Sequence, residues 1–314
     1  MSNLATRVTV SVIGIPLILW FTMTGGFPFF LFIAAVSTLG LYEFFRMAEG
    51  RGASPQKWVG MAFGLAINAA FFFGRLQYLL LEWAKSMGLG LPLPTMFQLL
   101  VILFLLFLPL ILLVELFRNR PAPARNVAAT VFGVCYVSLF LGSLIGLREL
   151  FTPADFPVYR HFSVHGLAIA PDVAETVYRW GGYTVLSLFA ALWLCDSAAY
   201  FFGIRFGRHK LLERVSPNKT WEGATAGFLA AVIAFLTARA LVLPYMSLTT
   251  AVVCGILVGG FGQLGDMVES LFKRDAGVKD SSRLIPGHGG ILDRFDSLIF
   301  VSPLIYVYLD FVVF

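Results

Sequence analysis

Nine apolar stretches, separated by short polar segments, run through this 314-residue chain. A helix needs about 20 apolar residues to cross about 30 Å of hydrocarbon, and each stretch is close to that length. They predict an all-α polytopic integral membrane protein with about nine transmembrane helices. The stretches cover residues 8–23, 27–45, 59–81, 97–117, 127–147, 183–204, 223–242, 250–272 and 291–313.

The composition agrees with a membrane protein and excludes several other classes. The chain is 58% hydrophobic and 13% charged, whereas an ordinary soluble domain has about 25% charged residues. Its net charge of +5 does not indicate a nucleic-acid partner, because in a membrane chain the location of the cations matters more than their sum. All three cysteines lie in apolar stretches, which excludes a disulfide framework and a cysteine-based zinc site.

The basic residues predict the orientation of the chain. If the amino terminus lies in the cytoplasm, 17 of the 23 Lys and Arg residues fall on the inner side. Cytoplasmic segments of membrane proteins are enriched in these residues. We therefore expect a cytoplasmic amino terminus and a carboxyl terminus outside. The first stretch is expected to be retained, since no A-x-A-like cleavage site follows it.

Two regions are expected along the chain. Residues 1–182 form the amino-terminal transmembrane helices and include the longest loop, 149–182, on the outer face. Residues 183–314 form a catalytic transmembrane region with its site at the cytoplasmic face. This second region is expected to be catalytic because it contains acidic residues within or at the ends of apolar stretches, next to basic loops. Charged side chains in a bilayer are costly, so such residues need a partner or a function.

The eighth apolar stretch carries glycines and acids on one helical stripe. Steps of three or four residues place such positions on the same face of a helix. Glycines permit close packing against a neighbouring helix, so the acids that follow them should be held near that helix. The stripe consists of Gly255, Gly259, Gly262, Asp266, Glu269 and Lys273.

The ninth stretch opens with Asp293 and Asp296, one helical turn apart, directly after the sequence Gly-His-Gly-Gly. Backbone N–H groups in such a glycine-rich segment can approach an anion at the helix start. Each aspartate alone could simply pair with a nearby Lys or Arg. Together with Asp266, however, these acids are the ligands that Mg²⁺ takes alongside substrate phosphates.

A third acid and a basic loop extend this pattern. Asp196 lies within the sixth stretch, where a structural role and a functional role are equally plausible. The loop over 208–223 adds Lys210, Arg214 and Lys219 on the side that carries the cations after the eighth stretch. Carboxylates ringed by cations at a membrane face suit phosphoryl or nucleotidyl transfer. The absence of a Walker A motif argues against a P-loop ATPase.

The segment 270–296 resembles the signature of the phosphatidate cytidylyltransferases, which are also called CDP-diacylglycerol synthases. The elements "GDMVES" at 265–270, "SPNKTWEG" at 216–223 and "DSAAYFFGIRFG" at 196–207 are similar to further elements of that family. The signature matches at Ser270, Lys273, Arg274, Lys279, Asp280, Ser282, Pro286, His288, Gly289, Gly290, Asp293, Arg294 and Asp296.

The resemblance implies a reaction of CTP with phosphatidate that gives CDP-diacylglycerol and pyrophosphate. It implies Mg²⁺ as cofactor, with a second cation left open. The expected metal ligands are Asp266, Asp293 and Asp296, and Lys219 joins Asp266 and Asp293 as a catalytic residue. The expected substrate-binding residues are Asp196, Lys273, Arg274, Lys279, Asp280, His288 and Arg294.

Two alternatives stay open from the sequence. A cation- or proton-coupled transporter also buries aspartates in glycine-rich helices, although it has no evident need for a basic loop with Gly-His-Gly-Gly. A cytidylyltransferase could also act on another lipid phosphate. We expect membrane lipids as partners, no nucleic acid, and a location in the bacterial inner membrane with the site facing the cytoplasm. A homodimer is left open.

Overall fold

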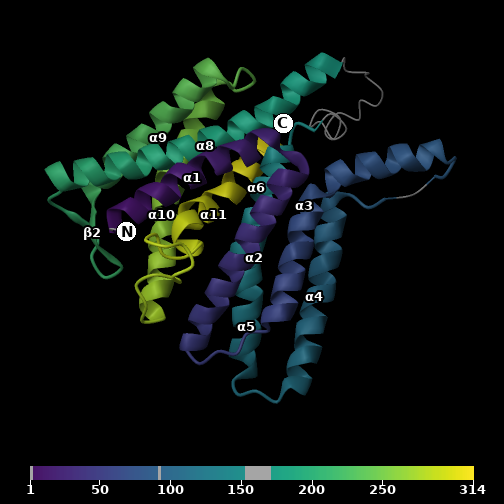
Figure 1. The fold of residues 1–314 in the computed structure, drawn as a ribbon, viewed down its shortest axis with the longest axis horizontal. Helices are drawn as coiled ribbons and strands as arrows, with labels where there is room; N and C mark the ends of the chain where they lie inside the picture. Colours follow the sequence, from purple (N-terminus) through teal and green to yellow (C-terminus); the bar gives the residue numbers. More distant parts are fainter. Residues whose placement is uncertain (1–2, 91–92, 153–170) are drawn as a thin grey trace. The chain divides into compact units, whose positions relative to one another are not determined.

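The computed structural model describes residues 3–90, 93–152 and 171–314, and long helices make up most of this part of the chain (Figure 1). The only named strands there form one short hairpin. The helices are α1 (Asn3–Thr24), α2 (Gly26–Gly50), α3 (Lys57–Ser86), α4 (Met96–Arg118), α5 (Pro123–Gly133), α6 (Phe140–Glu149), α8 (Pro171–Phe206), α9 (Trp221–Leu241), α10 (Leu248–Asp275) and α11 (Leu292–Val307). The π-helical segment η1 (Val134–Leu139) joins α5 to α6, and η2 (Tyr308–Val313) continues α11.

These helices confirm the predicted fold class. Across the described residues, eight helical segments are long and apolar enough to cross a membrane. The shorter apolar segment Val8–Thr24 of α1 lies at the first predicted stretch. Each of the nine apolar stretches therefore folds as a helix.

Two segments predicted as loops are partly regular. The prediction of a loop over 149–182 is wrong for residues 171–182, because α8 begins at Pro171, and residues 153–170 of that loop lie outside the described part. Proline suits the first turn of a helix. The helix then continues through Gly181, where a Cβ would collide with the carbonyl of Arg148, so this glycine marks a close contact rather than a break.

The second such segment lies between α8 and α9. There the predicted loop over 208–223 contains an antiparallel hairpin of β1 (Lys210–Leu212) and β2 (Ser216–Thr220). Thr220 ends the hairpin and caps α9, since its hydroxyl accepts a 3.2 Å hydrogen bond from the N–H of Gly223.

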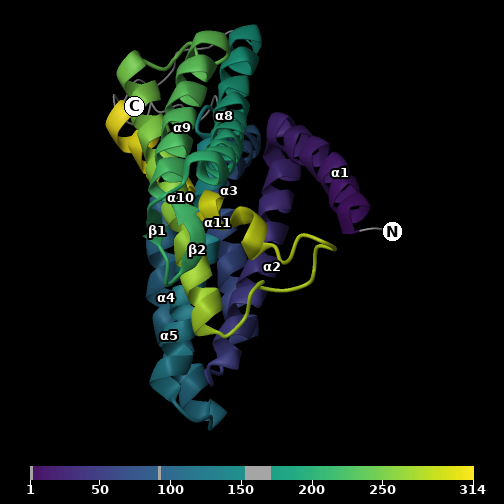
Figure 2. The same ribbon diagram turned by 90° about the vertical axis from the view of Figure 1, so that its left-hand side faces the viewer.

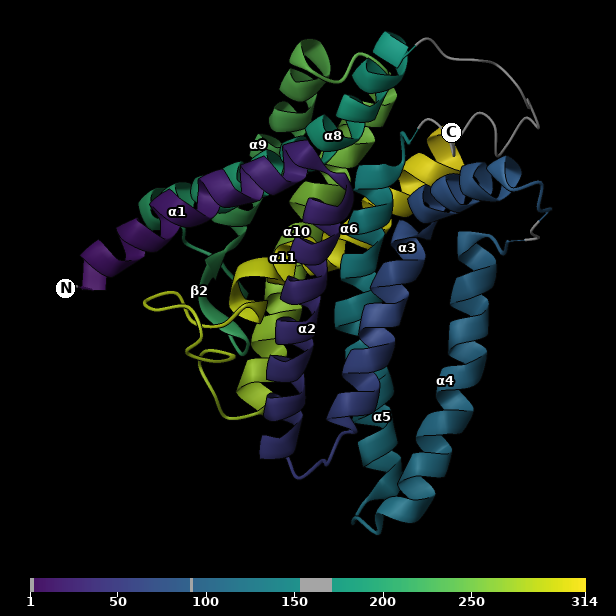
Figure 3. The same cartoon turned by 45° about the vertical axis from the view of Figure 1, so that its right-hand side comes forward.

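The chain divides into two compact units. Unit 1 combines Met1–Met23 with Gly182–Val313, and unit 2 consists of Thr24–Gly181 with Phe314. In unit 1, α10 packs against both α9 and α11, and Figure 2 shows α8, α9 and α10 next to one another. In unit 2, α3 packs against α2 and α4, as Figure 3 shows.

Glycines of α10 bring its neighbours into close backbone contact, as the stripe predicted for Gly259; Gly265, which is not part of the stripe, makes a second such contact. A Cβ at Gly259 would lie 2.8 Å from the Cα of Phe228 on α9. A Cβ at Gly265 would lie 3.0 Å from the carbonyl oxygen of Asp296 on α11. Glycine thus lets α9 and α11 approach α10. The contact at Gly265 places Asp296 next to the turn that carries Asp266.

We expect Gly259→Ala to lower the temperature at which the purified protein unfolds in detergent. The added methyl group meets backbone atoms of Phe228, which cannot rotate away, and overpacking of this kind costs about 1 to 3 kcal/mol. Gly260→Ala is the matched control, because nothing lies within 4 Å of a Cβ at that position. Equal unfolding temperatures for the two variants would contradict the proposed packing.

Two buried acids of unit 2, Glu149 and Glu115, have partners within that unit. Glu149 accepts hydrogen bonds from the N–H of Gly26 at 2.8 Å and from Tyr178 Oη at 2.9 Å, and it pairs with Arg75 at 3.1 Å. The guanidinium groups of Arg75 and Arg148 lie over the ring of the same tyrosine, at 4.9 and 4.3 Å from its centroid. This cluster fastens the start of α2 to α3, α6 and α8.

A second cluster in unit 2 surrounds Glu115 on α4. Its carboxylate accepts hydrogen bonds from Asn126 at 2.6 Å, from Gln56 at 2.9 Å and from Arg118 at 3.0 Å. Because its partners come from the segment before α3, from α4 and from α5, this acid serves packing within unit 2. The acids of unit 1 have different surroundings.

Candidate functional site

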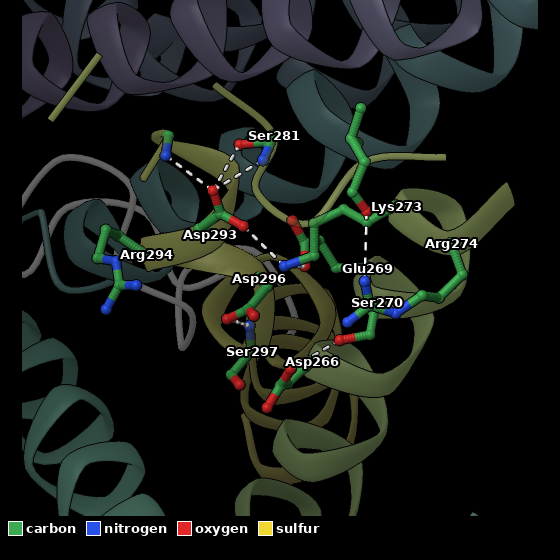
Figure 4. Close-up of polar contacts among 12 residues, drawn as sticks. Asp266, Glu269, Ser270, Lys273, Arg274, Ser281, Asp293, Arg294, Asp296 and Ser297 are labelled. Carbon is green, nitrogen blue, oxygen red and sulfur yellow. Dashed lines mark hydrogen bonds and ion pairs between the residues drawn. The ribbon is translucent and has the colours of Figure 1, made fainter. Parts of the chain in front are cut away.

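The acids predicted at the ends of separate helices lie together in unit 1, where α10 and α11 meet (Figure 4). Asp296 of α11 is close enough to Asp266 of α10 and to Asp196 of α8 for their charges to act on it. Lys219 and Arg294 act on Asp196 in the same way. Three helices therefore contribute one acid each to a single cluster with cations beside it.

Lys219 connects the hairpin to this cluster. Its Nζ lies 2.6 Å from Oδ2 of Asp266, and the two side chains are 27% and 34% exposed. The other carboxylate oxygen of Asp266 accepts a long hydrogen bond of 3.4 Å from Ser270 Oγ. Asp266 thus keeps one well-placed cationic partner and remains accessible to a ligand.

Asp293 is held much more firmly than Asp266. Its side chain is 5% exposed, and its Oδ1 lies 2.6 Å from Nζ of Lys273. Its Oδ2 accepts hydrogen bonds from the N–H of Ser281 at 2.9 Å, from the hydroxyl of the same serine at 2.9 Å, and from the N–H of Gly290 at 2.7 Å. The glycine-rich segment was expected to direct a backbone N–H group at an anion. In the structure, the N–H of Gly290 instead donates to the carboxylate of Asp293.

Lys273 is the buried link between α10 and α11. It pairs with Asp293 and also with Glu269, whose side chain is 1% exposed. Oε1 of Glu269 is buried and has no hydrogen-bond partner among the described residues. The sequence placed Glu269 on the acidic stripe but did not predict a function for it. Its pairing with Lys273 could have been predicted, because residues four apart lie on the same face of a helix.

The loop between α10 and α11, residues 276–291, presents the other predicted residues. Arg274, Lys279, Asp280 and Arg294 are exposed at or beside this loop. Arg294 Nε donates a 2.9 Å hydrogen bond to the carbonyl of His288, and the rest of its guanidinium group has no hydrogen-bond partner in the described part of the chain. The loop and its two ends therefore carry exposed charged residues that the sequence predicted to bind substrate.

His288 and its glycine neighbours have a constrained geometry. Gly289 has a φ of +86°, and a Cβ there would lie 2.7 Å from Oδ2 of Asp293, so both conformation and space require glycine. His288 Nε2 lies 3.5 Å from the hydroxyl of Ser11 on α1, a contact that the sequence did not predict. Its Nδ1 is buried without a partner among the described residues.

The acids fit a magnesium ion that is shared with a substrate. Within the described ranges, no group of three or more His, Cys, Asp or Glu side chains could enclose a metal ion by itself. Mg²⁺ is usually bound by one or two carboxylates together with substrate phosphates and water. Asp266 is accessible and Asp296 adjoins it, whereas both oxygens of Asp293 already accept hydrogen bonds or an ion pair.

Comparison with known proteins extends the resemblance over the whole chain. The cytidylyltransferase family matches residues 5–312. A Synechocystis protein named phosphatidate cytidylyltransferase is 33% identical over 303 residues, which is 96% of this chain and 95% of that protein. Proteins of the same name from Staphylococcus epidermidis and Staphylococcus aureus are 49% and 47% identical over 125 and 129 residues. These two matches cover 40% and 41% of this chain, and 48% and 50% of those proteins.

Proposed function

The chain belongs to the cytidylyltransferase family, and from this premise we propose that it transfers the cytidylyl group of CTP to phosphatidate. The products are CDP-diacylglycerol and pyrophosphate, and the protein is a nucleotidyltransferase of phospholipid biosynthesis. The observation that carries this proposal is the 33% identity to the Synechocystis enzyme over 96% of the chain. Membership of this family argues against the transporter alternative.

The reaction needs charge neutralisation more than proton transfer. An oxygen of the lipid phosphate attacks the α-phosphorus of CTP, the bond to the β-phosphate oxygen breaks, and pyrophosphate leaves with its electron pair. Both reactants are anions, so cations that face the phosphates lower the barrier. Lys219 and Arg294 lie beside the acid cluster, and Arg274 and Lys279 are exposed at the adjoining loop. We assign the binding of the triphosphate and of pyrophosphate to these four residues.

The acids are proposed to hold the cofactor. Mg²⁺, when bound, would offset negative charge on both phosphates. Asp266 and Asp293 are the leading ligands expected from the sequence. Because both oxygens of Asp293 are already occupied by Lys273, Ser281 and Gly290, we propose that Asp266 binds the ion together with Asp296, which lies next to it. Asp293 also holds the loop through Gly290, and Lys273 orients the carboxylate of Asp293. Asp280, Asp196 and His288 are proposed to shape the substrate site.

A membrane location is consistent both with a lipid substrate and with the apolar helices. Eight helical segments of the described residues can cross a bilayer, so the acyl chains of a lipid substrate can remain in the bilayer while its phosphate reaches the site. We propose that the protein lies in a bacterial inner membrane with the site facing the cytoplasm, where CTP is made. The excess of Lys and Arg on that side supports this orientation.

The proposed function is tested with the purified full chain, labelled CTP, Mg²⁺ and a panel of lipid phosphates. We expect a liponucleotide and an equal amount of pyrophosphate with diacyl phosphatidate, and no product when a chelator removes Mg²⁺. A dialkyl ether phosphate in the same panel tests the alternative acceptor. Failure to form a liponucleotide from any lipid phosphate would reject the proposal.

A further inference from the structure

The segment that joins α8 to α9 combines an exposed surface with an unusual charge. We call residues 205–221 the basic hairpin; it includes β1, β2 and the helix ends on either side. Both flanking helices are long and apolar enough to cross a membrane, ending at Phe206 and beginning at Trp221. With so few residues between two spans, the basic hairpin must lie close to the membrane surface.

Three arginines of the basic hairpin have side chains without a partner among the described residues. Arg205, Arg208 and Arg214 are exposed, and their guanidinium groups bond to no side chain or carbonyl in the part of the chain that the structure describes. The neighbouring carboxylate of Glu222 is occupied, because it lies 2.6 Å from His209 Nδ1 and accepts hydrogen bonds from two N–H groups of this turn. Three arginines therefore remain available to an external anion.

Apolar side chains accompany these cations. Phe206 is 55% exposed, Leu212 is 43% exposed and Trp221 is 58% exposed. Large apolar groups in water would be unfavourable, whereas tryptophan and phenylalanine beside arginines are typical of the boundary between lipid headgroups and acyl chains. The mixture therefore fits a lipid surface better than it fits free solution.

The same hairpin is anchored to the acid cluster. Lys219 lies on β2, and its Nζ pairs with Asp266 at 2.6 Å. Val215 at the turn is 3% exposed, so the hairpin is also held by packing. Anions bound by these arginines would consequently be held on the same segment that contacts the site.

We propose that the basic hairpin binds anionic lipid headgroups and so concentrates the lipid phosphate substrate beside the site. A phosphate monoester carries about −1.5 to −2 charges near neutral pH, whereas a phosphatidylcholine headgroup has no net charge. Arginine also pairs with phosphate through two parallel N–H donors. The statement that the captured lipid is the substrate rests on the proposed function; the binding itself does not.

The binding is tested without CTP. The full chain in detergent is mixed with equal amounts of phosphatidate and phosphatidylcholine, and the lipids that it retains are counted by native mass spectrometry. The test variant is Arg205→Gln, Arg208→Gln, Arg214→Gln. The matched control removes the same charge from exposed arginines of unit 2, by Arg46→Gln, Arg120→Gln, Arg125→Gln. The loss of a single cation near a lipid surface weakens binding about fivefold, so we expect at least a fivefold loss of phosphatidate preference in the test variant alone.

A kinetic measurement in nanodiscs completes the test. The test variant should show at least a fivefold higher KM for the mole fraction of phosphatidate, with kcat and the KM for CTP unchanged. Unaltered lipid retention, or an equal loss in the control, would overturn the proposal. A raised KM for CTP with an unchanged KM for phosphatidate would also overturn it and assign these arginines to the nucleotide. Since retention is measured without CTP, it succeeds or fails independently of the proposed reaction.

Discussion

Asp266→Asn is expected to lower CTP-dependent product formation by about two to three orders of magnitude in a protein that still folds and inserts. The amide keeps the size of the side chain but removes the charge that pairs with Lys219 and that is proposed to bind Mg²⁺. Because this side chain is 34% exposed, the loss of its charge should leave the packing of α10 intact. Turnover is measured with labelled CTP, and folding by the thermal unfolding temperature.

Asp275→Asn on the same helix is the matched control, since Asp275 is an exposed acid at the end of α10 and lies outside the proposed machinery. We expect this control to retain its activity. Asp293→Asn should differ from both. It should lose activity and also stability, because Asp293 accepts hydrogen bonds from Ser281 and Gly290 and holds Lys273. Normal turnover in both Asp266→Asn and Asp293→Asn would reject the metal assignment.

Lys273→Met is expected to destabilise unit 1 and to abolish activity together. Lys273 is 8% exposed and pairs with the buried carboxylates of Glu269 and Asp293. Removing one partner of a buried ion pair leaves an uncompensated charge, which costs about 3 to 5 kcal/mol. Urea or thermal unfolding in detergent measures the loss, and the same preparation is assayed with labelled CTP.

The double variant Lys273→Met, Glu269→Gln separates the two effects. Neutralising Glu269 removes one of the stranded charges, so most of the lost stability should return. Product formation should remain low, since Asp293 then lacks its cation at the start of α11. A double variant that is as unstable as Lys273→Met alone would contradict the assignment of Glu269 as the partner of this lysine.

Some contacts of the site residues could be predicted from the sequence, whereas others could not. The stripe on α10 was predictable because three- and four-residue steps share a helix face, and two of its glycines, Gly255 and Gly259, do meet the backbone of α9. The pairing of Asp266 with Lys219 was not predictable, because these residues are far apart in sequence and meet only when the hairpin folds onto α10. The contact of Ser11 with His288 was missed for the same reason.

The sequence by itself determined that the chain is a helical membrane protein, and its motifs pointed to a cytidylyltransferase. Apolar length, the placement of cations and a local signature are properties of consecutive residues, so they can be recognised without coordinates. Only the tertiary structure decided which partners each carboxylate has and which carboxylate remains accessible. Asp293 is committed to the loop and to Lys273, while Asp266 stays accessible beside Lys219. The physical reason is that a carboxylate's partners depend on how α8, α10, α11 and the hairpin pack, and spacing along one helix does not specify that packing.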